Sequence, residues 1–242
     1  MVQSIKMYKI NKFPTTFPVA TEKVVNDGID KIQFETIVKV LGDSEYEGTP
    51  LKKLQIIHQI GAVFSGKGIL EDGSIHEIIA TANEEAFPAF VKSEQYLYTS
   101  GTRREISVQA IKRLRQFKKH DNSLEAQNVK LNLTDFKTHL EESNGGAIKG
   151  GWFRGMKIKN VEVAYLGGGS VTNSDDWERY ETSGGTISAL RIDLPLGGAE
   201  EEPTKVLLTH DGNCVVYKNV GEHDLLSIAI PVFEAAEEFI NK

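Results

Sequence analysis

The stretch TKVLLTHDGNCVVYKN, residues 204–219, decides the fold class of this chain. Two β-branched and apolar runs flank Asp211-Gly212, a dipeptide that favours a two-residue hairpin turn with positive φ at its central positions. We therefore expect an antiparallel hairpin in which Cys214 lies opposite Thr209, on the other face from His210. That register favours a buried cysteine acting as a small hydrophobic residue over a nucleophile paired with a histidine base.

Period-two alternation predicts further strands on both sides of this hairpin. Residues 31–41, KIQFETIVKVL, place apolar and β-branched side chains on one side of a half-buried strand. Residues 69–80, ILEDGSIHEIIA, hold a second Asp-Gly pair between two apolar runs and predict another hairpin. Strand patterns recur at residues 158–165 and 187–196. Helix and strand remain alternatives for LKKLQIIHQIGAVF, which follows Thr49-Pro50.

Three segments show helical periodicity. Residues 105–119 form the clearest amphipathic helix, whose apolar face is made of Ile106, Ala110, Ile111, Leu114 and Phe117. Residues 133–145 predict a second helix with Thr134 or Asp135 as its N-cap. Residues 221–242 predict a terminal helix that Pro231 either opens or kinks. The fold class expected is α+β, with mixed, largely antiparallel sheets and a few amphipathic helices.

Length and composition bound the domain organisation. The chain has 242 residues, of which 40% are apolar, and this is enough for one large domain or two small ones. The polar stretch 118–128 divides a strand-rich part, 1–122, ending in a basic helix, from an α+β part, 123–242, unless the two form one continuous domain. With one cysteine, no signal-peptide pattern and no membrane-length apolar run, we expect a cytoplasmic protein.

The charge distribution restricts any nucleic-acid site to a local patch, because the formal net charge of the chain is −6. Residues 103–120 are basic, in contrast to the acidic chain as a whole, because they contain seven Lys or Arg residues and only one acid. Three of these cations line one helical face and two stand at its N-terminal approach: Lys112, Arg115 and Lys119, and Arg103 and Arg104. This is a candidate phosphate ladder. The alternatives are an acidic protein partner or an ordinary solvated helix face.

A long segment between two predicted strands is the second candidate site. Residues 167–185, GGGSVTNSDDWERYETSGG, exceed the length of most connections in compact domains. Trp177, Arg179 and Tyr180 have the composition of a recognition anchor if they are exposed. A merely mobile loop is the alternative, and the clustered carboxylates also suggest a divalent cation, although their spacing is not that of an EF-hand.

Two further motifs favour structural roles. Residues 61–67, GAVFSGK, have the glycine and lysine spacing of a P-loop, but Gly68 stands where a serine or threonine would hold magnesium. Residues 150–157, GGWFRGMK, resemble an anion-binding turn, but a turn leading into a strand with Trp152 or Phe153 in the core is favoured. The histidines show no spacing typical of a helix-borne zinc site.

These patterns together favour a non-catalytic binding protein that recognises nucleic acid, or a nucleic-acid-handling protein, through the basic helix and the Trp177 segment. No catalytic residue, metal site or cofactor is predicted. The partner expected is nucleic acid or an acidic protein surface, with no membrane, and homo-oligomer formation is left open. One alternative is a metal-dependent phosphodiesterase or nuclease, with its ion held by carboxylates such as Asp175, Asp176 and Asp193. Another is an assembly module, in which the basic helix of one subunit docks on the acidic C-terminal helix of another.

Overall fold

The structure of this protein is a computed structural model, which describes residues 2–17, 20–24, 32–46, 49–116, 123–143, 145–195 and 202–241. The chain divides into two compact units. We call one the ribbon unit, made of Lys9–Glu45 and Thr49–Gln127. The other, the C-terminal unit, is made of Met1–Tyr8, Tyr46–Gly48 and Asn128–Lys242. The two consecutive parts expected from the sequence stay a prediction.

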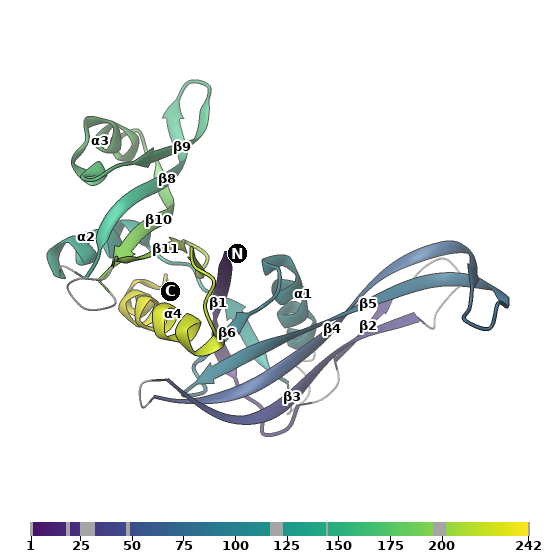
Figure 1. Cartoon of the computed structure of the whole chain (residues 1–242). Coiled ribbons are helices and arrows are strands. Elements are labelled where there is room, and N and C mark those ends of the chain that lie inside the picture. Colours follow the sequence, from purple (N-terminus) through teal and green to yellow (C-terminus); the bar gives the residue numbers. More distant parts are fainter. Residues whose placement is uncertain are drawn as a thin grey trace. The chain divides into compact units, whose positions relative to one another are not determined.

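The ribbon unit is built on antiparallel strands that follow one another in space as they do in the sequence. The order is β2 (Ala20–Val24), β3 (Ile32–Tyr46), β4 (Thr49–Ile69), β5 (Ile75–Lys92) and β6 (Tyr96–Ser100). The helix α1 (Arg104–Arg115) follows β6 and contacts β2 and β4, and the short strand β7 (Glu125–Asn128) comes later (Figure 1). Buried apolar side chains of this unit include Phe34, Leu54, Phe87, Phe90, Leu97, Ile106 and Leu114.

The second Asp-Gly hairpin is confirmed, because β4 and β5 pair up to Ile69 and Ile75. Gly73 has φ of +80° and donates its N–H to the Leu70 carbonyl at 2.9 Å, which closes the turn. The segment after Thr49-Pro50 is therefore a strand. Residues 61–67 do not form a P-loop, because they lie within strand β4, paired with β5, and not in a loop that precedes a helix.

The C-terminal unit contains a second run of antiparallel strands. Its order is β1 (Gln3–Lys12, of which this unit takes the residues to Tyr8), β12 (Asn213–Val216), β11 (Thr204–Thr209), β10 (Thr186–Leu194), β8 (Ala147–Ile158) and β9 (Val161–Gly167). Its helices are α2 (Leu133–Ser143), α3 (Asp175–Thr182) and α4 (Glu222–Ala236), with short 3₁₀ turns η1 (Val171–Asn173) and η2 (Glu237–Phe239). Helix α2 packs on β8 and β10. The predicted α+β class is confirmed as a sheet-dominated fold.

The deciding hairpin forms, but its predicted register is wrong by one residue. Cys214 pairs with Leu208 and not with Thr209, because the turn holds the three residues His210–Gly212. Gly212 has φ of +73° and donates its N–H to the Thr209 carbonyl at 3.0 Å. A three-residue loop of this kind ends on a left-handed residue and forms a G1 bulge, which an Asp-Gly pair serves as well as a two-residue turn does.

We expect Cys214 to resist thiol reagents in the folded protein. Its side chain is fully buried, and this burial raises the pKa of the thiol to about 12. A thiol with that pKa is thiolate in only about one part in ten thousand at pH 8. Ellman's reagent should therefore label no thiol in native protein and one thiol in urea. If the native protein were labelled at the rate of an exposed thiol, Cys214 would have to be considered again as a nucleophile with His210 as its base.

The helices begin close to their predicted positions, but the terminal helix is shorter than predicted, because α4 ends at Ala236 and the 3₁₀ turn η2 follows it. In the second helix the cap is Asn132 and not Thr134 or Asp135, because the Asn132 side-chain oxygen accepts N–H groups from both of those residues at 3.2 and 3.3 Å. Pro231 lies inside α4 and does not open it. None of the helices in the described ranges combines the length and the apolar character that crossing a membrane requires.

Candidate functional site

Helix α1 is fixed to the ribbon unit by the buried side chain of Arg113. Its guanidinium Nη1 donates to the carbonyl oxygens of Glu35 on β3, at 3.0 Å, and Gln59 on β4, at 2.8 Å. The same nitrogen lies 3.2 Å from both Thr36 Oγ1 and His58 Nδ1. Because Nη1 carries only two hydrogens, it can donate to two of these four groups at a time, and the two carbonyl oxygens are its shortest contacts. One cation thereby ties the helix to two strands.

The side of α1 away from Arg113 carries Arg104, Lys112 and Arg115, and Arg103 is the N-cap residue just before the first turn. Arg103, Arg104, Lys112 and Arg115 are all exposed, while Ile106, Ala110, Ile111 and Leu114 are buried, as the helical periodicity predicted. Lys119 and Phe117 lie outside the described residues. Arg104 and Arg115 are eleven residues apart, so the cationic face extends over about 16 Å of helix.

The charges on this cationic face are suited to an external anion. Within the part of the chain that the structure describes, the side chains of Arg103, Lys112 and Arg115 make no hydrogen bond or ion pair. Lys112 and Arg115 are three residues apart and therefore neighbours on the helix surface, where like charges repel. The C-terminal end of the helix dipole offsets part of that repulsion. An anionic partner would remove the rest.

The predicted exposure of Trp177 is wrong. The long segment folds as η1 and α3, and Ser174 caps α3 by accepting the Trp177 N–H at its side-chain oxygen, 3.3 Å away. The indole is only 1% exposed and packs edge to face on Phe153, with ring centroids 4.8 Å apart. It also lies over Gly151, where a Cβ atom would come within 2.5 Å of the ring. Trp177 is a core residue of the C-terminal unit.

The two other side chains of this predicted anchor differ in exposure. Arg179 is exposed, lies 3.3 Å from Asp176 in an ion pair and stacks over the Tyr180 ring at 5.2 Å. Tyr180 is half-buried against Phe153, with ring centroids 5.5 Å apart. Their role in binding stays a prediction, now without the tryptophan at its centre.

The carboxylates of the phosphodiesterase hypothesis lie on different elements. Asp175 and Asp176 stand exposed in the first turn of α3, and Asp193 lies on β10. Among the described residues, no three His, Cys, Asp or Glu side chains come together in a way that would hold a metal ion. These three aspartates therefore do not make such a group.

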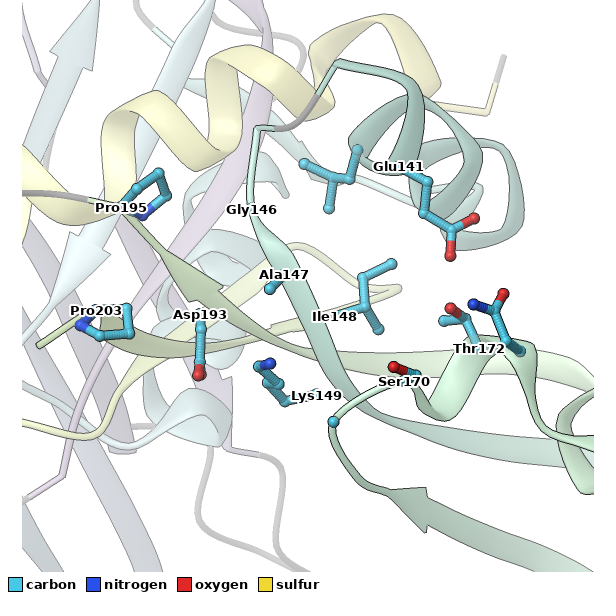
Figure 2. Close-up of a pocket in the computed structure, with 13 residues that line it drawn as sticks. Glu141, Gly146, Ala147, Ile148, Lys149, Ser170, Thr172, Asp193, Pro195 and Pro203 are labelled. Carbon is cyan, nitrogen blue, oxygen red and sulfur yellow. The ribbon is translucent and has the colours of Figure 1, made fainter. Parts of the chain in front are cut away.

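A pocket of about 610 Å³ in the C-terminal unit was not expected from the sequence. Figure 2 shows Lys149 of β8 and Asp193 of β10 close together on one side of the pocket, and Glu141 of α2 on the opposite side. Ser170 lies near Thr172 on the η1 segment. The lining mixes one cation with two acids. The charged side chains therefore carry an excess of only one negative charge, and no aromatic ring lines the pocket. The residues come from separate elements, so no local motif marks them.

The end of the β4–β5 ribbon was also not predicted as a surface of interest. Three large apolar side chains are exposed around its turn, Ile69 at 75%, Leu70 at 49% and Ile75 at 65%. Ile69 and Ile75 are direct cross-strand partners. Exposed apolar clusters of this kind mark interaction surfaces in many proteins.

Three features of the described residues can thus carry a function: the cationic face of α1, the pocket beside Lys149 and the apolar end of the ribbon. The sequence predicted only the first of them. No protein-family model matches this chain, and a comparison with curated proteins finds no similar sequence.

Proposed function

We propose that this protein is a non-catalytic binding protein that acts through protein–protein contacts, and that the cationic face of α1 holds an acidic protein surface. The observation that carries the proposal is the exposure of Arg103, Lys112 and Arg115 without partners among the described residues, on a helix that the buried Arg113 fixes in place. A rigid helix that presents fixed charges loses little entropy on binding.

Nucleic acid is the second candidate partner, because cations at helical spacing also suit a phosphate backbone. The burial of Trp177 weakens this candidate. Without that indole the predicted site loses its aromatic side chain for stacking on bases, so phosphate contacts alone would remain. The exposed apolar residues at the ribbon end favour a protein partner over a phosphate backbone.

A charge-reversal variant tests the site. With Arg103, Lys112 and Arg115 changed to glutamate, we expect binding of fluorescent poly-glutamate at low salt to weaken about 3- to 150-fold, since exposed ion pairs contribute roughly 0.2–1 kcal/mol each. Fluorescence anisotropy across a salt series measures the affinity. The matched control reverses three exposed cations of the C-terminal unit, Lys159, Lys205 and Lys218, and has the same net charge.

The outcomes separate the candidates. Poly-glutamate binding that the α1 variant loses and the matched control keeps supports the proposed function. If the protein binds labelled DNA or RNA through the same residues and ignores poly-glutamate, the second candidate replaces the first. Equal loss in both variants, or no binding to any polyanion at low salt, would overturn the assignment of α1 as a docking site.

A further inference from the structure

A second pocket of the C-terminal unit lies between the start of α2 and the strands β8 and β10, and its volume is about 360 Å³. All of its lining residues belong to this unit, and none of them lines the pocket beside Lys149. The volume is within the range of sites that bind small molecules in proteins. The side chains that line this pocket can therefore be considered as contacts for a small ligand.

The charge of the lining is positive. Arg154 of β8 lines the pocket, and no aspartate or glutamate does. Its guanidinium makes no hydrogen bond or ion pair within the described ranges, and its cross-strand neighbours Val163 and Thr186 are uncharged. Asp135, which follows the lining residues in α2, already accepts the Asn132 side-chain N–H at 2.6 Å. The N–H donors of Arg154 are therefore available to an anion that enters the pocket.

His210, in the turn between β11 and β12, also lines the pocket. Its Nδ1 lies 3.3 Å from the Ser188 carbonyl oxygen, which can only accept, so Nδ1 carries a proton and donates it to this bond. The backbone N–H of His210 donates to the same oxygen at 3.0 Å, which fixes the residue beside β10. Nε2 is then the ring nitrogen left for a ligand, and His210 adds a second positive charge when Nε2 takes a proton.

Thr134, at the start of α2, adds an exposed hydroxyl from a third element, and its Oγ1 has no hydrogen-bond partner among the described residues. The backbone N–H groups of this helix end contribute less, because the Asn132 side chain already accepts those of Thr134 and Asp135. The side chains available to a ligand thus come from three separate elements. A tetrahedral oxyanion has oxygens that point in several directions, whereas the two oxygens of a carboxylate lie in one plane.

We propose that this pocket binds the phosphate group of a small molecule. The guanidinium fork of Arg154 suits two phosphate oxygens, and Thr134 and His210 contact the others. The site belongs to a different unit from the cationic face of α1, so it goes beyond the proposed function and does not depend on it. The glycine-rich motif at residues 150–157 contributes through Arg154, because its glycines lie within β8 and its Lys157 does not line the pocket.

Chemical-shift titration with inorganic phosphate tests the site. In a chloride buffer of constant ionic strength, the backbone amides of Thr134, Arg154 and Ser188 should shift in a saturable way, and acetate should shift them less. Arg154→Met should weaken phosphate binding at least tenfold, because it removes charge-assisted hydrogen bonds. Arg154→Lys keeps the charge without the fork and should give an intermediate loss.

Two further variants make the test specific. Lys157→Met is the matched control, because it removes an exposed cation of the same strand that does not line the pocket and gives the same net charge as Arg154→Met. We expect it to bind phosphate as the wild type does. Thr134→Val removes the hydroxyl at nearly constant volume and should weaken phosphate binding about 2- to 10-fold. Circular dichroism should stay unchanged in these variants, because all three side chains are exposed.

The outcomes separate this site from general surface charge and from the proposed function. Saturable shifts at the pocket that Arg154→Met weakens and Lys157→Met keeps support the proposal. Equal weakening by these two variants, or the absence of saturable shifts at the pocket, would overturn it. Acetate that binds as tightly as phosphate through the same residues would overturn the phosphate assignment in favour of a carboxylate ligand. The charge-reversed α1 variant should still bind phosphate in the pocket, so failure of the proposed function would leave this result unchanged.

Discussion

Trp177→Ala should lower the free energy of unfolding of the C-terminal unit by about 3–5 kcal/mol, the range for removing a large buried aromatic side chain. The indole is almost completely buried, packs edge to face on Phe153 and lies beneath the Lys137 ammonium at 5.8 Å. Alanine would leave a cavity between α3 and β8, and Gly151 has no side chain to fill it. Urea denaturation followed by circular dichroism measures the change.

Two variants make the measurement specific. Trp177→Phe keeps an aromatic ring in the cavity and should cost less than the alanine variant. Tyr165→Ala removes an aromatic side chain that is 45% exposed on β9, and we expect a smaller loss from it as well. If Trp177→Ala changed stability by less than about 1 kcal/mol, the indole would not be a core residue, and its role as an exposed anchor would have to be considered again.

The burial of Trp177 could not be predicted from its own segment. Residues 175–182 contain one tryptophan among acids, an arginine and a tyrosine. A helix of eight residues is too short for apolar residues to recur at helical spacing, so its sequence does not indicate which face is buried. The partners that bury the indole, Gly151 and Phe153, come from a strand more than twenty residues earlier. Composition alone therefore favoured exposure, and only the packing of α3 on β8 decides otherwise.

The strands and hairpins were easier to predict because their signals are local. Alternation at residues 31–41 and the two Asp-Gly pairs each depend on neighbours in sequence, and all three form the expected elements. The register at Cys214 was missed because an Asp-Gly pair serves both two- and three-residue turns. The length of β4 was missed for another reason. The spacing of its apolar residues is compatible with a helix and with a strand, and only the pairing with β5 decides for the strand.

Part of the candidate site did have an unused signal in the sequence. Arg113 lies three residues after Ala110 and seven after Ile106, so helical spacing alone places it on the apolar stripe. It is 7% exposed and binds inside the unit, whereas its neighbours Lys112 and Arg115 face outward. A cation on an apolar stripe predicts an internal role. The groups that accept its hydrogen bonds are two backbone carbonyls of the strands, and these could not be predicted because every residue has a backbone carbonyl.

Arg113→Met should destabilise the ribbon unit by about 2–4 kcal/mol, because buried acceptors left without a donor cost roughly 1–3 kcal/mol each. Methionine keeps much of the apolar stem but removes the donors to the Glu35 and Gln59 carbonyls and to Thr36. Urea denaturation gives the total loss. Hydrogen exchange of the α1 amides should rise more than that of the C-terminal unit, since the change falls on the attachment of this helix.

Lys112→Met is the matched control, because it removes the adjacent cation, which is exposed and has no partner among the described residues. We expect this control to stay within about 0.5 kcal/mol of the wild type. The two variants should also separate anchoring from binding. We expect Lys112→Met to weaken poly-glutamate binding at unchanged stability, because under the proposed function it removes a charge that contacts the partner. Arg113→Met weakens binding through a loosened helix, so conditions that restore the fold should restore the affinity. If Arg113→Met left both stability and α1 protection unchanged, the guanidinium would not be what holds the cationic face in position.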